Sequence, residues 1–203
     1  MKLETYIENE IIPRYLGFDR AHGPEHAKSV IDRSLKLAEI YGLDLRMVYA
    51  AAAYHDTGLA EGREWHHLVS GRIIREDRML REWFTEEQIE TIAEAAEDHR
   101  ASAAREPRSI YGRVLAEADR QIDPELTVRR TVQYGLSHYP EMGKEEHWRR
   151  MLEHLQEKYA EGGYLKLLIP ESDNARRLEE LRSLMKDRSR LREIFEKEYS
   201  EGA

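Results

Sequence analysis

The segment with the clearest potential for chemistry is AAAAYHDTGL, residues 50–59, where an apolar run ends in the adjacent pair His55 and Asp56. Imidazole nitrogens and carboxylate oxygens are common ligands of divalent metal ions. A buried ionised Asp is costly unless it is paired or bound to a cation. His26 and Asp119 would complete a mixed nitrogen and oxygen donor set. The alternative is a His–Asp hydrogen bond at a helix end, with ordinary core histidines elsewhere.

Helical periodicity predicts that His26 and His55 point toward the interior of the protein. A helix expected over about residues 26–41 carries His26 on the same face as Val30. The next helix, expected over about residues 45–56, carries His55 on its apolar side. Both histidines are therefore expected to point inward.

Later helices are expected to bring further donors to the same interior. A helix begins near Glu64, and a Thr85-x-x-Gln88 capping box opens another, whose apolar periodicity continues to His99. Pro107 can start the next helix, which has Asp119 on its inward side and is expected to end before Pro124. Inward placement thus recurs in successive helices, which favours a common site.

Composition limits the fold and the function classes. The chain has 203 residues, of which 35% are charged and 40% hydrophobic, with only 12 Gly and 6 Pro, and this composition predicts an all-α protein. A formal net charge of -8 argues against a broad nucleic-acid surface or an anionic-membrane surface. The absence of Cys excludes disulfides and thiolate zinc sites. The start lacks an apolar signal core and the apolar runs are short, so we expect a cytoplasmic protein.

The second half of the chain carries weaker signals. We expect a loop at SHYPEMGKEEHW and a short apolar segment at YLKLLIP, which ends at Pro170. We therefore expect a metal-binding domain over residues 1–170 and a charged C-terminal helix over residues 171–203. The apolar stripe of that helix is expected to pack on the body of the protein or on a second copy, as a homodimer.

The order of the candidate ligands resembles that of the HD-domain metal-dependent phosphohydrolases, whose pattern is a His, a His-Asp doublet, further His and then an Asp. The resemblance covers roughly residues 22–123 and rests on HGPEHAKSV, AAAYHDTGL, REWHHLVSG, AEDHR and LAEADRQID. It implies an all-α helical bundle with a site for one or two metal ions. It also implies that the core ligands are His26, His55, Asp56 and Asp119.

The resemblance further implies that His99 and one of His66 and His67 are the extra ligands of the members with two ions. On a helical projection, His66 lies within the apolar face of its helix and His67 lies at its edge. The family pattern has a small residue four positions after the ligand, which Ser70 provides for His66, although Gly71 would serve His67 equally. We therefore predict His66 as the ligand and His67 as its neighbour.

Substrate phosphate needs further cationic groups, and basic residues flank the ligand segments. The candidates are Arg100, Arg120, Lys28 and Arg63. The ordinary alternative is that such residues near helix ends are solvated or interact with helix dipoles. His22 is a candidate outer-shell or phosphate-contacting group, and Asp123 is a further acidic candidate.

The function implied is hydrolysis of a phosphomonoester or phosphoanhydride in a small, nucleotide-like metabolite by attack of a metal-bound hydroxide, with His55 and Asp56 at the catalytic centre. Asp56 could bridge two ions and orient the attacking water. The donor types suit Mn²⁺, Fe²⁺, Co²⁺ or Zn²⁺, and Mg²⁺ at a water-rich site. Two alternatives remain: a diiron oxygenase on a similar scaffold, and a nucleotide-binding regulator without catalysis.

Overall fold

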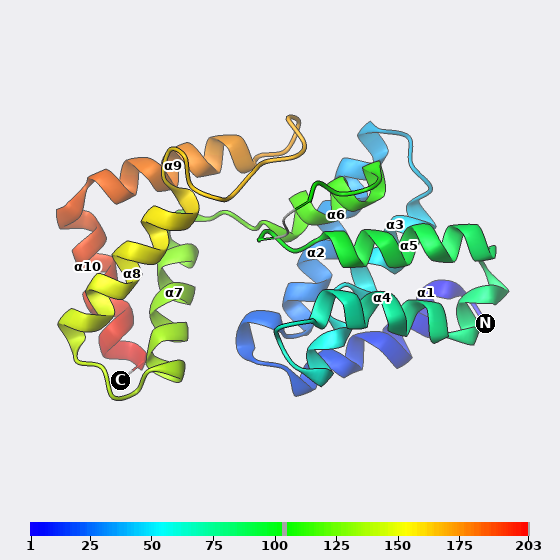
Figure 1. Cartoon of the computed structure of the whole chain (residues 1–203), viewed down its shortest axis with the longest axis horizontal. Coiled ribbons are helices and arrows are strands. Elements are labelled where there is room, and N and C mark those ends of the chain that lie inside the picture. Colours follow the sequence, from blue (N-terminus) through cyan, green and yellow to red (C-terminus); the bar gives the residue numbers. More distant parts are fainter. Residues whose placement is uncertain (103–104, 203) are drawn as a thin grey trace. The chain divides into compact units, whose positions relative to one another are not determined.

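The computed structural model describes residues 1–102 and 105–202, apart from the side chain of residue 20, and it confirms the predicted all-α class (Figure 1). The described residues contain no strand. The α-helices are α1 (Leu3–Tyr6), α2 (Pro24–Ile40), α3 (Leu45–Tyr54), α4 (His66–Glu76), α5 (Glu86–Asp98), α6 (Ile110–Asp119), α7 (Pro124–His138), α8 (Lys144–Tyr159), α9 (Asn174–Lys186) and α10 (Arg188–Gly202). Short helical turns are η1 (Ile7–Ile11), η2 (Ile12–Gly17), η3 (Arg20–His22), η4 (Thr57–Glu61) and η5 (Arg78–Glu82).

None of the helices within the described residues has the length and apolar character needed to cross a bilayer.

The chain divides into two compact units. Unit 1 comprises residues 1–120 and 168–172, and unit 2 comprises residues 121–167 and 173–203. This division groups residues 121–167 with the C-terminal helices, whereas the sequence suggested a boundary at residue 170.

The core of unit 1 surrounds α3. Ala50, Ala51, Ala52 and Ala53 are all buried, and α3 packs against α2, α5 and α6. Small side chains let these neighbouring helices approach closely. At its start, the Asp44 carboxylate accepts hydrogen bonds from the backbone N–H groups of Arg46 and Met47. Because α3 ends inside the core, the residues that follow it are buried as well.

The boundaries of the later helices differ in detail from the sequence prediction. The capping box that opens α5 is confirmed: Thr85 Oγ1 accepts from Gln88 N at 3.3 Å, and Gln88 Oε1 accepts from Thr85 N at 3.0 Å. Helix α4 begins at His66 rather than near residue 64, because the chain first turns at Gly62, which has φ +112°. Helix α6 begins three residues after Pro107, where Ser109 Oγ accepts from Gly112 N.

Unit 2 is a small helical bundle with a core of its own. Pro124, expected to close the preceding helix, is the first residue of α7. The loop expected over residues 137–148 is present but shorter: residues 139–143 connect α7, which extends to His138, with α8, which begins at Lys144. The tail forms two helices rather than one, because Asp187 ends α9 and then accepts from Arg190 N. The buried core residues are Val128, Val132, Met151, Leu155, Leu191, Ile194 and Phe195.

Candidate metal centre

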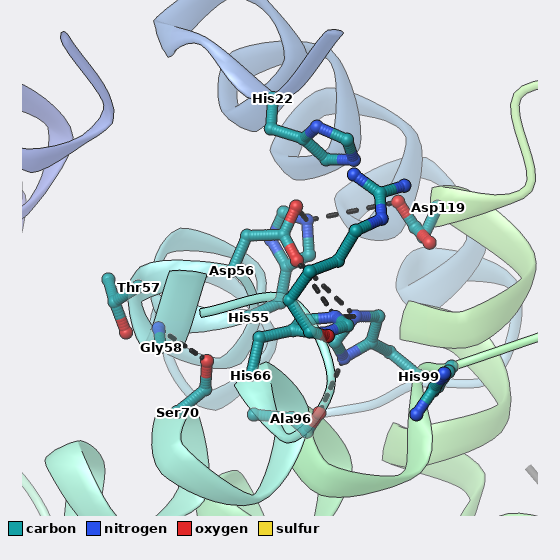
Figure 2. A network of polar contacts seen from close by, with 12 residues as sticks. His22, His55, Asp56, Thr57, Gly58, His66, Ser70, Ala96, His99 and Asp119 are labelled. Atoms are coloured by element: carbon teal, nitrogen blue, oxygen red, sulfur yellow. Dashed lines mark hydrogen bonds and ion pairs between the residues drawn. The ribbon is translucent and has the colours of Figure 1, made fainter. Parts of the chain in front are cut away.

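The six predicted ligands lie together in unit 1. Figure 2 labels five of them and shows their side chains pointing toward one another. They come from the start of α2, the segment after α3, the start of α4, the residue after α5 and the end of α6. The His55 side chain is fully buried, and His99 and Asp56 are 3% exposed. The set comprises His26, His55, Asp56, His66, His99 and Asp119.

One part of this cluster, here named the His26 half-site, consists of His26, His55, Asp119 and one oxygen of Asp56. His26 Nε2 lies 3.2 Å from His55 Nε2. Asp56 Oδ2 is 3.6 Å from His26 Nε2 and 3.3 Å from His55 Nε2. Asp119 Oδ1 is 3.2 Å from His26 Nε2 and 3.8 Å from His55 Nε2. Four potential donor atoms therefore face one another.

The other part, the His66 half-site, consists of His66, His99 and the second oxygen of Asp56. His66 Nε2 lies 3.2 Å from His99 Nε2. Asp56 Oδ1 is 3.4 Å from His66 Nε2 and 3.5 Å from His99 Nε2. The two oxygens of the Asp56 carboxylate are thus directed to different histidine pairs, and Asp56 joins the two half-sites.

Backbone hydrogen bonds orient three of the imidazole rings. Nδ1 of His55 lies 2.7 Å from Ala52 O, Nδ1 of His66 lies 2.7 Å from Arg63 O, and Nδ1 of His99 lies 2.5 Å from Ala96 O. A carbonyl oxygen only accepts, so each Nδ1 carries the hydrogen and each neutral ring turns an Nε2 lone pair toward the cluster. In the His66 half-site the two Nε2 atoms lie 3.2 Å apart, and two facing lone pairs would be stabilised by a proton or a metal ion between them.

The histidines of the cluster differ in how readily they bind a proton. Burial opposes the protonation of His26, but hydrogen bonds to Asp119 and Asp56 outweigh it and raise its pKa to about 9. Burial and the nearby His99 lower the pKa of His66 to about 4. Burial also opposes the protonation of His99, but its hydrogen bond to Asp56 outweighs burial and raises its pKa. In the absence of a metal ion a proton can therefore be held by His26 in one half-site and by His99 in the other, whereas His66 stays neutral near pH 7.

The carboxylates of the cluster are anionic. Burial alone would raise the pKa of Asp56, but His55 and the other surrounding histidines hold it well below its usual range. The pKa of Asp119 is lowered in the same way, chiefly by its hydrogen bond to His26. The buried carboxylate of Asp56 and the partly exposed carboxylate of Asp119 lie among imidazole nitrogens, and this environment favours a bound cation.

The spacing of the donors fits a divalent ion. With metal–ligand distances of about 2.0–2.2 Å, two ligands of one ion lie about 3.0–3.6 Å apart. The contacts within each half-site, 3.2–3.8 Å and 3.2–3.5 Å, are close to this range. The buried cluster can therefore hold a divalent metal ion, and its donor types are compatible with several metals.

The turn after the His-Asp doublet fixes the position of α4. Gly58 N donates to Ser70 Oγ at 2.9 Å (Figure 2). Thr57 Oγ1 donates to Tyr54 O at 2.7 Å. A Cβ atom on Gly58 would overlap with the carbonyl oxygen of His66. The sequence pattern identified Gly58 as the end of a helix, but this close approach depends on the tertiary structure.

The predicted His22 lies beside the cluster, with its ring centroid 5.8 Å from that of His26. Its Nδ1 is 2.8 Å from Asp19 Oδ1, and Asp19 Oδ2 is 3.7 Å from Arg63 Nη1. Figure 2 shows His22 on the side of the site where Asp119 also lies. Asp19 was not among the predicted residues, because its only sequence signal was a spacing of three from a turn histidine.

The remaining predicted residues have varied environments. Arg100 Nη1 donates to Glu64 O at 2.9 Å and so links the segments that carry His99 and His66. Lys28 is half exposed and lies 3.9 Å from the Glu25 carboxylate. Asp123 accepts from Leu126 N at 2.9 Å and caps α7, so its carboxylate has a structural partner in unit 2.

The structure distinguishes the two neighbouring histidines. His66 contacts Asp56 and His99, whereas His67 belongs to neither cluster of potential metal ligands among the described residues. We expect His66→Ala to reduce metal content and to weaken metal affinity about 10–100-fold. His67→Ala, the matched control, should retain both. Metal analysis and titration of the two purified variants provide the measurement. Loss of metal in His67→Ala with retention in His66→Ala would contradict this assignment.

The fold and the cluster define an all-α protein with a buried centre of His and Asp side chains. A family model described as HD domain matches residues 24–121, which confirms for this part of the chain the resemblance noted in its sequence. The fold is similar to the crystal structure of a predicted HD superfamily hydrolase from an uncultured Thermotogales bacterium. That comparison has a TM-score of 0.51 and 20% identity, and covers 75% of this chain and 90% of the other. No curated protein matches the chain.

Proposed function

We propose that this protein is a metal-dependent phosphohydrolase that acts on a phosphomonoester or phosphoanhydride of a small, nucleotide-like metabolite. The observation that carries the proposal is the Asp56 carboxylate, whose two oxygens face two separate histidine pairs within an HD domain. The name of the structurally similar protein, a predicted hydrolase, supports the reaction class.

The residues of the cluster would have the following roles. His26, His55 and Asp119 would hold one ion and His66 and His99 a second, with Asp56 shared between them. A bound divalent cation would supply Lewis acidity, which polarises a phosphoryl oxygen and lowers the pKa of water. The Asp56 carboxylate, which stays anionic, would help to orient the attacking water. The buried histidines would keep competing solvent away from the reacting atoms.

Arg120 is the strongest of the predicted phosphate-binding groups. Its Nε and Nη1 atoms are buried and have no hydrogen-bond partner among the described residues. Burial lowers the pKa of this guanidinium, although Glu117 and Asp119 oppose the effect, and arginine remains charged near pH 7. Two buried guanidinium N–H groups without hydrogen-bond acceptors are unfavourable, so an anionic ligand would stabilise them.

We expect Arg120→Ala to raise KM for the phosphorylated substrate about 10–100-fold while the metal content is retained, since charge-assisted hydrogen bonds contribute about 1.5–3 kcal/mol. Arg113→Ala on the same helix is the matched control, because Arg113 is exposed and lies 3.8 Å from Glu106. Steady-state kinetics and metal analysis of both variants give the answer. Unchanged kinetics in Arg120→Ala would remove this residue from the substrate site.

The proposed function is tested by metal analysis of the purified protein, followed by a screen of divalent metals against phosphorylated metabolites. Release of phosphate that depends on added metal and is absent in Asp56→Asn would support it. Bound iron with oxygen consumption would instead identify a diiron oxygenase. Tight nucleotide binding with no turnover for any metal would identify a regulator.

A further inference from the structure

Tyr15 lies directly behind the His-Asp doublet. It belongs to η2, its side chain is fully buried, and its ring centroid is 6.2 Å from that of His55. The Tyr15 hydroxyl donates to Ala53 O at 2.9 Å and accepts from Asp56 N at 3.2 Å. One hydroxyl group therefore contacts the backbone on both sides of His55.

The backbone at this point needs partners from outside its helix. Helix α3 ends at Tyr54, and the groups around a helix end require other hydrogen-bond partners when they are buried. The carbonyl oxygen of Ala52 is already used by Nδ1 of His55. The Tyr15 hydroxyl satisfies the next carbonyl along the chain and the N–H group of Asp56 itself.

The hydroxyl is suited to this task because it stays protonated. The ordinary pKa of a tyrosine hydroxyl, about 10, keeps it protonated near pH 7. A neutral hydroxyl donates one hydrogen bond and still accepts another. The remainder of the ring packs edge-on against Phe18, at a centroid separation of 5.4 Å, which fixes its orientation.

This residue comes from a part of the chain that the HD match does not include. The match spans residues 24–121, whereas Tyr15 belongs to the preceding segment, which packs on α2 through η2. The segment also reaches η4, the turn that follows the doublet. The N-terminal segment thus contacts the elements on both sides of the candidate centre within unit 1.

We propose that Tyr15 is a positioning residue for the metal centre: its hydroxyl holds the end of α3 so that the carboxylate of Asp56 presents one oxygen to each histidine pair. The inference rests on the proposed metal centre. Without the hydroxyl, the Asp56 N–H group and the Ala53 carbonyl would be buried without this shared partner. The backbone would then shift to regain hydrogen bonds, and Asp56 would move with it.

The test is Tyr15→Phe, which keeps the ring and removes the hydroxyl. Partners that orient metal ligands typically contribute about 10–100-fold to metal affinity, and we expect a loss of that size. Titration of the full chain with Co²⁺, followed by the visible absorption of the bound ion, measures affinity and ligand geometry without relying on turnover. A changed Co²⁺ spectrum is expected together with the weaker binding.

Tyr6→Phe is the matched control. Tyr6 also belongs to the N-terminal segment and donates a hydrogen bond of 2.7 Å, but its acceptor is Asp77, which follows the last residue of α4. His66 is at the opposite end of that helix of 11 residues, roughly 16 Å away at about 1.5 Å per residue. Tyr6→Phe should lose thermal stability yet keep its Co²⁺ affinity within about threefold of the unmodified protein, since its partner is not beside the ligands.

If Tyr15→Phe does not fold, 4-methylphenylalanine at position 15 fills the volume of the hydroxyl without restoring its hydrogen bonds, and 4-aminophenylalanine restores a donor. We expect weak Co²⁺ binding with the first and recovery with the second. Equal Co²⁺ affinity and identical spectra for Tyr15→Phe and the unmodified protein would overturn the role of Tyr15. An unmodified protein that takes up no divalent metal would overturn the proposed centre itself, and this inference with it.

Discussion

Replacing Asp56 with Asn is expected to abolish metal binding and metal-dependent turnover together. Asp56 Oδ2 lies 3.3 Å from His55 Nε2, and Oδ1 lies 3.4 Å from His66 Nε2, so the carboxylate serves both half-sites. Asn keeps one oxygen and has no charge, and its amide NH₂ group cannot bind a cation. The half-site that faces the NH₂ group would lose its oxygen ligand, and the other half-site would keep an oxygen that carries no negative charge. We expect turnover to fall roughly a thousandfold or more.

Asp77→Asn is the matched control for Asp56→Asn. Asp77 also carries a carboxylate with strong hydrogen bonds, from Tyr6 at 2.7 Å and from Tyr54 at 2.5 Å, but it follows the C-terminal end of α4. Its substitution should lower stability and leave the metal stoichiometry intact. Metal analysis and turnover measurements on both variants are needed, together with thermal unfolding. Full metal content and full turnover in Asp56→Asn would contradict the proposed centre.

The second large effect is expected from Gly58→Ala, which should destabilise the protein by about 3 kcal/mol or more. The added Cβ would overlap with the His66 carbonyl oxygen and approach Ser70 N at 2.7 Å. Both are backbone atoms of α4, so a side-chain rotation cannot relieve the overlap. Helix α4 would have to move away from the doublet and take His66 with it. Metal affinity should therefore fall along with stability.

Thermal unfolding should show a decrease in Tm of about 6–12 °C for Gly58→Ala, given a few degrees per kcal/mol in a chain of this size. Gly17→Ala is the control, since a Cβ at Gly17 would meet nothing within 4 Å and the residue ends η2 at the surface. Its effect should lie within about 0.5 kcal/mol of zero. A Gly58→Ala variant as stable as Gly17→Ala would show that α4 does not pack tightly at this position.

Much of unit 1 could be predicted because each predicted ligand accompanies a regular helix. His26 and His55 follow apolar residues at helical spacing, so local sequence sufficed to turn them inward. The Thr85 capping box is also a local signal, and the structure confirms it. The start of α4 was placed slightly early because the positive φ of Gly62 extends the preceding turn.

Long-range contacts could not be predicted in the same way. Tyr15 and Asp56 are 41 residues apart in sequence, and no pattern in IIPRYLG predicts a hydrogen bond to the backbone of Asp56. In unit 2 the apolar residues are sparse among charged ones, which obscured α7 and α8. The break between α9 and α10 depends on Asp187, and an acidic residue within a charged tail does not distinguish a helix cap from a solvated side chain.

The path of the chain through unit 1 has a consequence for biosynthesis. The chain leaves this unit after Arg120 and re-enters it for residues 168–172, where Leu168 N and Ser172 Oγ donate to the fully buried carboxylate of Glu117 at 2.7 Å and 2.5 Å. On a ribosome that adds about 5–20 residues per second, these donors emerge roughly 3–10 s after residue 120. During that interval a nascent chain has every candidate ligand but lacks the two hydrogen bonds that Leu168 and Ser172 donate to Glu117. Unit 1 therefore reaches its final form only after both intervening helices, α7 and α8, have been synthesised.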